Sequence, residues 1–442
     1  MFANAVYLIA LAALSPWILY RRIRHGRYRR GWRQKLLGLS RADAFRLVGA
    51  APTSQCIWLH AVSVGEVNLL GGLVKRLQSQ FPQTSIVISS STDSGYDLAV
   101  RRFGTERVFF CPLDFSWAVK RTLARLEPKL LVLAELELWP NLIKTARQRN
   151  TDVIVINGRL SQRSAAGYQR FAWLTRPIFT SLSSVQCQDE SSADRFVACG
   201  TPRSRIAISG SLKFDDAPQS RECVEVQSRA RWAGSDPWHM VWVVGSTQDG
   251  EEKMALDVYR RLCQRHSELR LILVPRHPER FDRVAQVIDA EGLLAHRRSR
   301  DGSLEDLKWT ADRVLLIDTI GELRHWWGVG QIATVGGTFG DRGGQNMLEP
   351  AGYGNAIAFG PDTRNFTDIA QRLLDAGGAV RVADAIELEA FLERCLTDIP
   401  AADSLGRAAK QVVEQHRGAT KRTVDAIGQF LAPDTQSQRR AA

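Results

Sequence analysis

Several common signatures of catalytic chemistry are missing from this sequence of 442 residues. The seven cysteines stand far apart with no CxxC pair, which argues against a disulfide framework or a cysteine zinc site and favours reduced thiols in the cytosol. The eight histidines form no HExxH motif, so no metal cluster is predicted. GxGxxG and GxxxxGK[ST] are both absent, which leaves a standard dinucleotide fingerprint and a P-loop unsupported. No Asp-x-Asp pair occurs, which weakens any mechanism that needs a carboxylate-held metal to bind a nucleotide diphosphate.

Acidic residues are fewer than basic residues, and the formal net charge is +12. Such an excess favours an anionic partner, for example nucleic acid, an acidic membrane surface or a phosphorylated substrate. Apolar residues make up 44% and charged residues 24%, close to the composition of a folded globular protein. The length predicts two domains, each with its own core.

The N-terminus combines an uncharged stretch with a basic block. Residues 2–20 carry no charge, and eight of the fifteen residues in 21–35 are Lys or Arg. The stretch is just long enough for a membrane-spanning helix, and the block predicts that the rest of the chain lies in the cytoplasm. A cleaved signal peptide fits poorly because the charges come after the apolar run, whereas an interfacial helix is a further possibility. We therefore predict a membrane anchor at residues 1–22 and a basic juxtamembrane segment at 23–54.

From residue 55 onward, short apolar runs alternate with longer amphipathic stretches. Each run is continuously apolar, as expected for the strands of a parallel sheet that helices cover on both faces. We predict an α/β protein with two doubly wound, Rossmann-like domains, whose carboxyl-terminal strand ends face each other across a ligand-binding cleft. The expected boundaries are 55–212 for the first domain, 213–238 for a junction, 239–431 for the second domain and 432–442 for a polar tail. One long helix, from about residue 401 to 431, is expected to close the second domain.

Glu66 follows a glycine at the start of a helical pattern, directly after the first predicted strand. Ser63-Val-Gly-Glu66 matches the S/T-x-x-E capping box, and the spacing alone favours this interpretation. The alternative is a general base at a strand end, with Gly65 allowing a substrate to approach the backbone.

Two further carboxylates, Glu135 and Glu137, close a buried strand. Their side chains lie on the same face if the strand continues through both residues. Ordinary surface carboxylates are the alternative. Lys213, at the start of the predicted junction, is expected either to supply positive charge or to be a solvated lysine.

Three segments of the second domain follow predicted strands and are suited to anions. In "VPRHPER", an arginine and a histidine stand between prolines, an arrangement that can orient a phosphate or carboxylate. In "DTIGEL", Gly321 can present backbone amides at a helix start. A glycine-rich loop then leads into a helix near Asn346, where Glu349 can accept hydrogen bonds from ribose hydroxyls.

Together these motifs resemble, in order and setting, those of the lipopolysaccharide Kdo transferases: "HAVSVGE", "ELELWPN", "NGRLSQRS", "GSLKFD", "GSTQDGEE", "PRHPERF", "DTIGEL" and "GGQNMLEP". The resemblance covers essentially the whole chain. It implies a membrane-anchored GT-B glycosyltransferase that moves 3-deoxy-D-manno-octulosonic acid (Kdo) from CMP-Kdo to a lipid A precursor, lipid IVA. Transfer would proceed with inversion and with neither a metal nor another cofactor.

The resemblance also implies a role for each candidate residue. Glu66 matches the general base, whereas Glu135 and Lys213 match positions that stabilise the transition state. The CMP-binding segments match Pro275 and Arg276; Ile320, Gly321 and Glu322; and Asn346, Met347, Leu348 and Glu349. The chain departs from the family pattern at Met347, Leu136, Gln248 and Ala61, where proline, threonine, histidine and serine are usual, and these changes bear on fine specificity.

The implied location is the inner membrane, with the catalytic domains on the cytoplasmic face beside anionic lipids and a lipid acceptor. A helix N-terminus is expected to keep the Glu66 carboxylate ionised. Two alternatives remain, namely a GT-B transferase for a UDP- or ADP-sugar, and a non-catalytic membrane scaffold or nucleic-acid binder. Nucleic acid is not expected as a partner, because basic and aromatic residues interleave only in the juxtamembrane block. The oligomeric state stays open.

Overall fold

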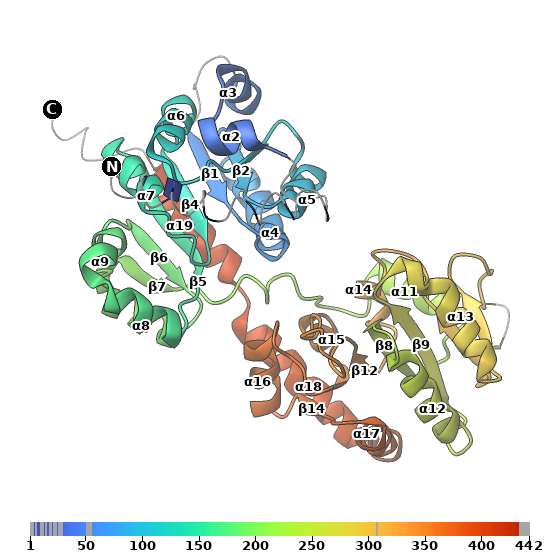
Figure 1. Cartoon of the computed structure of the whole chain (residues 1–442). Coiled ribbons are helices and arrows are strands. Elements are labelled where there is room, and N and C mark those ends of the chain that lie inside the picture. Colours follow the sequence, from blue (N-terminus) through green and yellow to red (C-terminus); the bar gives the residue numbers. More distant parts are fainter. Residues whose placement is uncertain are drawn as a thin grey trace. The chain divides into compact units, whose positions relative to one another are not determined.

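The computed structural model describes residues 30–49, 55–305 and 308–432, together with a few single residues before position 30. The chain forms two compact units, Met1–Asp216 with Arg417–Ala442, and Ala217–His416 (Figure 1). The predicted anchor at 1–22 and the tail at 432–442 lie almost entirely outside the described residues. None of the helices within those ranges combines the length and the apolar character that a membrane span requires.

The first unit is built on a parallel sheet of seven strands in the order β3-β2-β1-β4-β5-β6-β7. The strands are β1 (Cys56–His60), β2 (Ser85–Ser90), β3 (Val108–Phe110), β4 (Leu130–Ala134), β5 (Asp152–Gly158), β6 (Ser184–Cys187) and β7 (Ile206–Ile208). The strand order reverses between β1 and β4. In a doubly wound sheet, ligands bind at the carboxyl ends of the strands beside this reversal.

Helices cover both faces of this sheet and give each face a separate core. Neighbouring residues of β1 point to opposite faces, so Ile57 packs beneath α4 and Trp58 belongs to the opposite core. The helices are α2 (Trp32–Leu37), α3 (Arg41–Val48), α4 (Val64–Gln80), α5 (Asp93–Phe103), α6 (Ser116–Leu126), α7 (Pro140–Gln148), α8 (Gln162–Arg170), α9 (Ala172–Thr180), α10 (Glu190–Cys199), the 3-10 turn η1 (Arg203–Arg205) and α19 (Ala419–Leu431). Helices α2 and α3, which come from the predicted juxtamembrane segment, both pack against α6.

The second unit repeats the architecture with a parallel sheet in the order β10-β11-β9-β8-β12-β13-β14. Its strands are β8 (Met240–Thr247), β9 (Leu269–Pro275), β10 (Leu294–Arg297), β11 (Arg313–Leu316), β12 (Ile332–Val335), β13 (Ala356–Phe359) and β14 (Ala379–Arg381). The helical elements are α11 (Val224–Trp232), α12 (Glu251–Cys263), η2 (Pro278–Arg280), α13 (Phe281–Ala290), α14 (Leu323–Trp326), α15 (Leu348–Tyr353), α16 (Thr367–Asp375), α17 (Ala385–Thr397) and α18 (Ile399–His416). The prediction of two doubly wound α/β units is confirmed, and the order reverses between β8 and β12.

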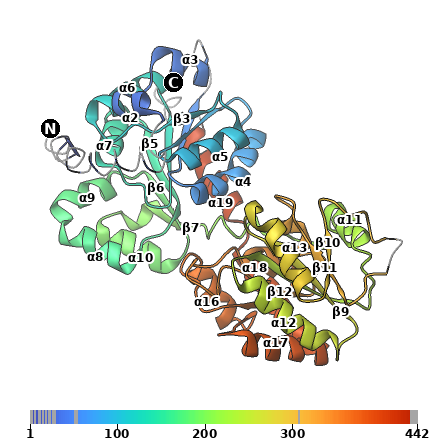
Figure 2. The same ribbon diagram turned by 45° about the vertical axis from the view of Figure 1, so that its right-hand side comes forward.

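The expected single helix over residues 401–431 is wrong. The segment forms two helices, α18 and α19, and only α18 belongs to the second unit. Gly418 separates them with a φ of 88°, a left-handed conformation that suits glycine. The Asp215 carboxylate accepts hydrogen bonds from the amides of Gly418 and Thr420, which fixes the start of α19. Helix α19 then packs against α4 of the first unit (Figure 2).

Candidate active site

Glu66 lies in the first turn of α4, directly after the carboxyl end of β1. The Ser63 hydroxyl caps the helix by accepting a hydrogen bond from the Glu66 amide at 3.4 Å. The Glu66 carboxylate in turn accepts from the Val62 amide at 2.8 Å and from the Ser63 hydroxyl at 2.9 Å. The capping interaction is therefore present, but the carboxylate reaches the amide one residue before the N-cap.

The Glu66 side chain is buried. Burial raises its pKa above the ordinary value, the hydrogen bonds from Val62 and Ser63 oppose this rise, and the negative charge of Glu135 adds to it. Burial therefore acts against the helix N-terminus, which is expected to favour the ionised form of this carboxylate. A carboxylate with a raised pKa is a stronger proton acceptor than an ordinary surface glutamate.

Glu135 and Glu137 lie in the turn after β4, on the other side of the strand reversal from Glu66. The strand ends at Ala134, and Glu135 adopts a φ of 57°, so the alternation expected from a continued strand does not apply. Burial together with the charges of Glu66 and Glu135 raises the pKa of Glu137 to about 7, although a 3.0 Å hydrogen bond from the Trp139 indole opposes the rise. Three glutamates thus influence one another at this edge of the sheet.

Lys213 supplies positive charge at the same edge. Its Nζ lies 3.9 Å from Oε1 of Glu135, and each of the two side chains is 33% exposed. The lysine is therefore paired with a carboxylate and is not a freely solvated side chain. Glu66, Glu135 and Lys213, which are far apart in the sequence, meet in the first unit.

In the second unit, Pro275 and Arg276 lie where β9 ends. Pro275 is buried, whereas Arg276 is exposed and is held through its amide, which donates to the Thr247 carbonyl at 3.1 Å. Among the described residues, none forms an ion pair or hydrogen bond with the Arg276 guanidinium. This cation is thus positioned by its backbone and available to an anion.

Ile320, Gly321 and Glu322 form the turn that enters α14. Ile320 is 81% exposed and Gly321 has a φ of 86°. Burial alone would raise the pKa of Glu322, but hydrogen bonds from Arg298 and Thr319 lower it below its usual range. These bonds measure 3.1 and 2.7 Å at Oε2. Glu322 is therefore committed to internal ion pairs, and the surfaces left for a ligand in this turn are its backbone and Ile320.

The segment from Asn346 to Glu349 divides into polar and apolar halves. The Asn346 side chain accepts a hydrogen bond from the Leu348 amide at 3.1 Å and donates to Glu349 Oε1 at 3.5 Å. Met347 and Leu348 are 0% and 1% exposed. Their side chains therefore pack in the core, so that ligand contacts here would come from Asn346, from Glu349 or from the backbone.

Two buried glutamates that were not among the predicted site residues organise the edge near β8 and β12. Glu251 accepts hydrogen bonds from the amides of Gln248 and Gly337, both at 2.8 Å, and of Phe339 at 3.2 Å. Its carboxylate thus ties the start of the glycine-rich loop to the end of β8. The consecutive pair in "GSTQDGEE" was the only sequence signal for them.

Glu252, the second of these glutamates, accepts hydrogen bonds from both terminal guanidinium nitrogens of Arg280, at 2.8 and 2.9 Å. It also accepts a 2.6 Å bond from the Thr247 hydroxyl. Arg280, the second arginine of "VPRHPER", is therefore occupied by an internal carboxylate.

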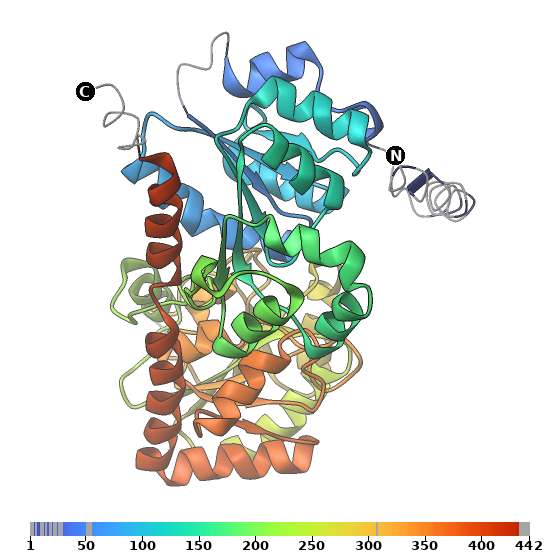
Figure 3. The same cartoon turned by 90° about the vertical axis from the view of Figure 1, so that its left-hand side faces the viewer.

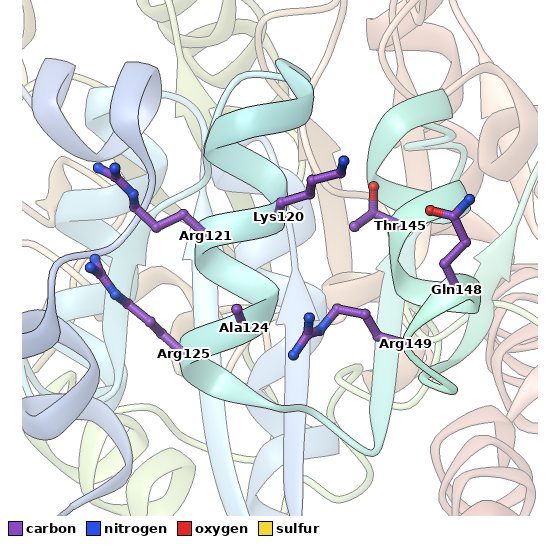
Figure 4. A pocket seen from close by; sticks show the side chains of 7 residues that line it. All are labelled: Lys120, Arg121, Ala124, Arg125, Thr145, Gln148 and Arg149. Atoms are coloured by element: carbon purple, nitrogen blue, oxygen red, sulfur yellow. The ribbon is translucent and has the colours of Figure 1, made fainter.

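A cavity of about 550 Å³ lies elsewhere, between α6 and α7 (Figure 4). Lys120, Arg121, Arg125 and Arg149 line it. Arg125 lies in the last turn of α6 and Arg149 directly follows α7, and a helix that crosses back over a parallel sheet ends at the amino edge of the strands. The cavity is therefore remote from Glu66 and Glu135, at the carboxyl edge, and we do not assign it to the active site.

Across the described ranges, no group of three or more His, Cys, Asp and Glu side chains is arranged to hold a metal ion. The first unit instead offers a buried carboxylate of raised pKa, Glu66, which interacts electrostatically with Glu135, the partner of Lys213. The second unit offers an exposed arginine and loop amides at the carboxyl edge of its sheet. These features suit proton abstraction and anion binding, respectively.

Comparison with known proteins places the chain in a family. The sequence profile described as "3-Deoxy-D-manno-octulosonic-acid transferase (kdotransferase)" matches residues 30–216. The 3-deoxy-D-manno-octulosonic acid transferase of Haemophilus influenzae is 34% identical over 406 residues, which are 90% of this chain and 92% of that protein. The protein of the same name from Bordetella pertussis is 32% identical over 97% of this chain and 99% of its own length.

A solved structure supports the architecture independently of sequence. A glycosyltransferase from Rickettsia africae matches with a TM-score of 0.54, covering 86% of this chain and 100% of that one at 8% identity. At this identity the likeness shows the fold alone, which is the GT-B arrangement of two parallel-sheet α/β units.

Proposed function

This chain belongs to the 3-deoxy-D-manno-octulosonic acid transferase family, and we propose that it transfers Kdo from CMP-Kdo to a lipid A precursor with Glu66 as the general base. The observation that carries the assignment of the base is the buried Glu66 carboxylate, with its raised pKa, at the carboxyl edge of the first sheet.

Capping and catalysis are compatible at Glu66. A carboxylate has about four lone-pair positions, and the hydrogen bonds from Val62 and Ser63 occupy one on each oxygen. The remaining lone pairs can accept the proton of a sugar hydroxyl. The two hydrogen bonds also hold the carboxylate in one orientation, which limits the reorganisation needed during the reaction.

In the proposed step, an acceptor hydroxyl attacks the anomeric carbon of Kdo while Glu66 takes its proton. A new C–O bond forms as the bond from the anomeric carbon to the phosphate oxygen of CMP breaks. CMP leaves with the electron pair, and the configuration at the anomeric carbon inverts. Glu66 then returns the proton to solvent.

Lys213 and Glu135 are proposed to stabilise the charges of this step. Kdo carries a carboxylate, for which Lys213 is a suitable partner, and the 3.9 Å contact with Glu135 keeps the ammonium in place. A fixed cation beside developing negative charge lowers the barrier more than a mobile one, because it needs no reorganisation.

CMP is proposed to bind the second unit along three segments. Arg276 would meet the phosphate, while the backbone of Ile320–Glu322 and the polar side chains of Asn346 and Glu349 would hold the nucleoside. Glu322, Met347 and Leu348 would shape the site from beneath. We propose that no metal takes part, because CMP carries a single phosphate and the sequence lacks an Asp-x-Asp pair.

The proposed location is the cytoplasmic face of the inner membrane, with residues 1–22 as the anchor and the basic segment beside anionic lipids. The acceptor is itself a phosphorylated lipid, so this location places the enzyme beside its substrate.

The direct test incubates the purified full chain with CMP-Kdo and a tetraacylated lipid A precursor and measures product masses. A mass increase of one or more Kdo residues is the expected outcome and also gives the number of additions. Competition by CMP but not by UDP is expected as well. Transfer from a UDP- or ADP-sugar in place of CMP-Kdo, or no transfer at all, would contradict the proposal.

A further inference from the structure

The end of strand β5 holds the backbone of both segments that carry the Lys213–Glu135 ion pair. The Ile156 carbonyl accepts a hydrogen bond from the Glu135 amide at 2.9 Å. Oδ1 of the next residue, Asn157, accepts from the amide of Leu212, directly before Lys213, at 3.0 Å. Two consecutive residues of one strand therefore set the distance between the two partners of the pair.

The conformation of Asn157 makes the second of these contacts possible. Its φ is 53°, in the left-handed region that asparagine tolerates better than most residues, and the strand pairing becomes irregular at the same place. Asn157 is fully buried, and its Nδ2 has no hydrogen-bond partner among the described residues. An unpaired buried donor and a left-handed residue other than glycine both cost stability, and such costs concentrate at functional sites.

Helix α19 holds the same segment from another side. The Arg422 guanidinium donates to the Ser209 carbonyl at 2.8 Å, and the Asp215 carboxylate accepts two amide hydrogen bonds at the start of the helix. Figure 3 shows α19 in dark red, next to the blue helix α4 against which it packs. The contacts of α19 thus lie on either side of Lys213 in the sequence.

The neighbours of Lys213 are anchored in the interior. Leu212 and Phe214 are 3% and 1% exposed, and Leu212 belongs to the core that α4 and α19 share. The Lys213 side chain is 33% exposed and reaches Glu135 at 3.9 Å. The position of the ammonium group is therefore set largely by the backbone that carries it.

We propose that Asn157 and Asp215 are positioning residues for Lys213, which fix its backbone and so hold its ammonium group beside Glu135. Neither side chain is assigned a contact with substrate. Asn157 begins "NGRLSQRS", a motif for which the proposed mechanism has no other role. The inference rests on the proposed function in that Lys213 takes part in the transfer. A preorganised cation stabilises developing charge better than one that must first reorganise, so loosening this backbone should slow the reaction.

The alternative is a purely structural role, in which loss of these contacts lowers stability without moving Lys213. Acetylation of Lys213 in the full chain, followed by mass spectrometry, separates the two roles without requiring transfer. Asn157→Gly removes the side-chain oxygen while glycine keeps the left-handed backbone, and Asp215→Ala removes the acceptor at the start of α19. In each variant Lys213 should react at least about threefold faster than in wild type, as it should in Glu135→Gln.

Conservative and control variants sharpen this measurement. Asn157→Asp and Asp215→Asn each keep an acceptor oxygen and should return Lys213 most of the way to its wild-type rate. Asn150→Gly makes the same substitution at an exposed asparagine with a φ of 59°. Asp384→Ala removes the cap of α17 in the second unit, where the carboxylate accepts amide bonds at 2.9 and 3.1 Å. Both controls should leave the acetylation of Lys213 unchanged.

A double-mutant cycle on Kdo transfer tests whether Asn157 acts through Lys213. Asn157→Gly should lower kcat about tenfold in the otherwise unchanged enzyme, but less than about twofold in the Lys213→Gln background. Binding of CMP, which is proposed to involve only the second unit, should be the same in all four proteins. A general loss of folding would instead lower CMP binding and transfer together.

An unchanged acetylation rate in both Asn157→Gly and Asp215→Ala would overturn the inference. Equal losses of kcat with and without Lys213 would overturn it as well. Failure of the proposed function gives a different pattern, in which acetylation responds as expected but Lys213→Gln transfers Kdo at the wild-type rate. That pattern would remove Lys213 from the reaction and leave intact the contacts that position it.

Discussion

Replacing Glu251 should loosen the glycine-rich loop of the second unit without touching a ligand-binding side chain. Glu251 is 6% exposed, and its carboxylate accepts three backbone hydrogen bonds, two of them from the loop amides of Gly337 and Phe339. The third comes from Gln248 at the end of β8. Removing the carboxylate would leave three amides without their acceptor.

The expected magnitude follows from the cost of unsatisfied buried amides. Each costs about 1–3 kcal/mol, and the three costs are not additive because the loop can relax or admit water. Glu251→Ala should therefore lower the free energy of unfolding by about 3–4 kcal/mol. Glu251→Gln keeps one acceptor oxygen but turns an amide donor toward backbone donors, so a loss of about 1.5–3 kcal/mol is expected.

Hydrogen exchange of peptides covering residues 332–345, together with urea unfolding, measures this effect. Affinity for CMP should fall in parallel, because the loop leads into Asn346 and Glu349. Glu279→Gln is the control, since that glutamate is exposed and, among the described residues, pairs only with His277, at 3.8 Å. If Glu251→Ala changed loop exchange and stability no more than Glu279→Gln, the role assigned to Glu251 would be refuted.

Three further predictions concern other parts of the chain. The folded-state pKa of Glu137 is about 7, above its usual 4.5, so between these pH values the folded protein holds a proton that the unfolded protein releases. The stability that the protonated Glu137 side chain contributes is therefore lost as pH rises through 7. Glutamine cannot lose this proton, so the free energy of unfolding of Glu137→Gln, relative to that of wild type, should rise by about 1–2 kcal/mol between about pH 5 and pH 8, after discounting for partial exposure. Urea unfolding at each pH measures this difference. Gly418→Ala should lose about 1–2 kcal/mol because its φ is 88°, whereas Gly72→Ala, in α4 with open space around it, should be neutral or stabilising. Lys213→Gln should reduce kcat of transfer about a hundredfold, with a smaller loss in Lys213→Arg.

Each of these has a clear contrary outcome. A constant difference between Glu137→Gln and wild type across the pH range would deny the raised pKa. Equal effects of the two glycine substitutions would deny the strain at Gly418. Wild-type transfer by a folded Lys213→Gln variant would remove Lys213 from the reaction.

The sequence predicted the architecture well where burial was uniform. The strands it predicted are continuously apolar, which is the pattern of strands buried on both faces of a parallel sheet. It missed the edge strands β7 and β10, whose residues are partly exposed and therefore show no continuous apolar run. It also joined α18 to α19, because the contact that separates them comes from Asp215, about two hundred residues earlier.

The sequence identified which residues belong to the candidate site, but it did not predict their ionisation or their partners. The spacing from Ser63 to Glu66 correctly indicated capping, yet the raised pKa of Glu66 depends on burial and on the charge of Glu135 across the strand reversal. The sequence motif suggests that Glu322 contacts a ligand, but in the structure its carboxylate forms ion pairs with Arg229 and Arg298, which are distant in sequence. Such pairings are set by tertiary contacts, which local spacing does not contain.

Kdo transfer by Glu66→Gln tests the central claim most directly. The glutamine keeps an oxygen to accept from Val62 or Ser63 but cannot take a proton at neutral pH. We expect a folded variant that binds CMP-Kdo with near-normal affinity and transfers Kdo to the lipid acceptor at least about a hundredfold more slowly. Near-normal transfer by that folded variant would show that Glu66 only caps its helix and is not the base.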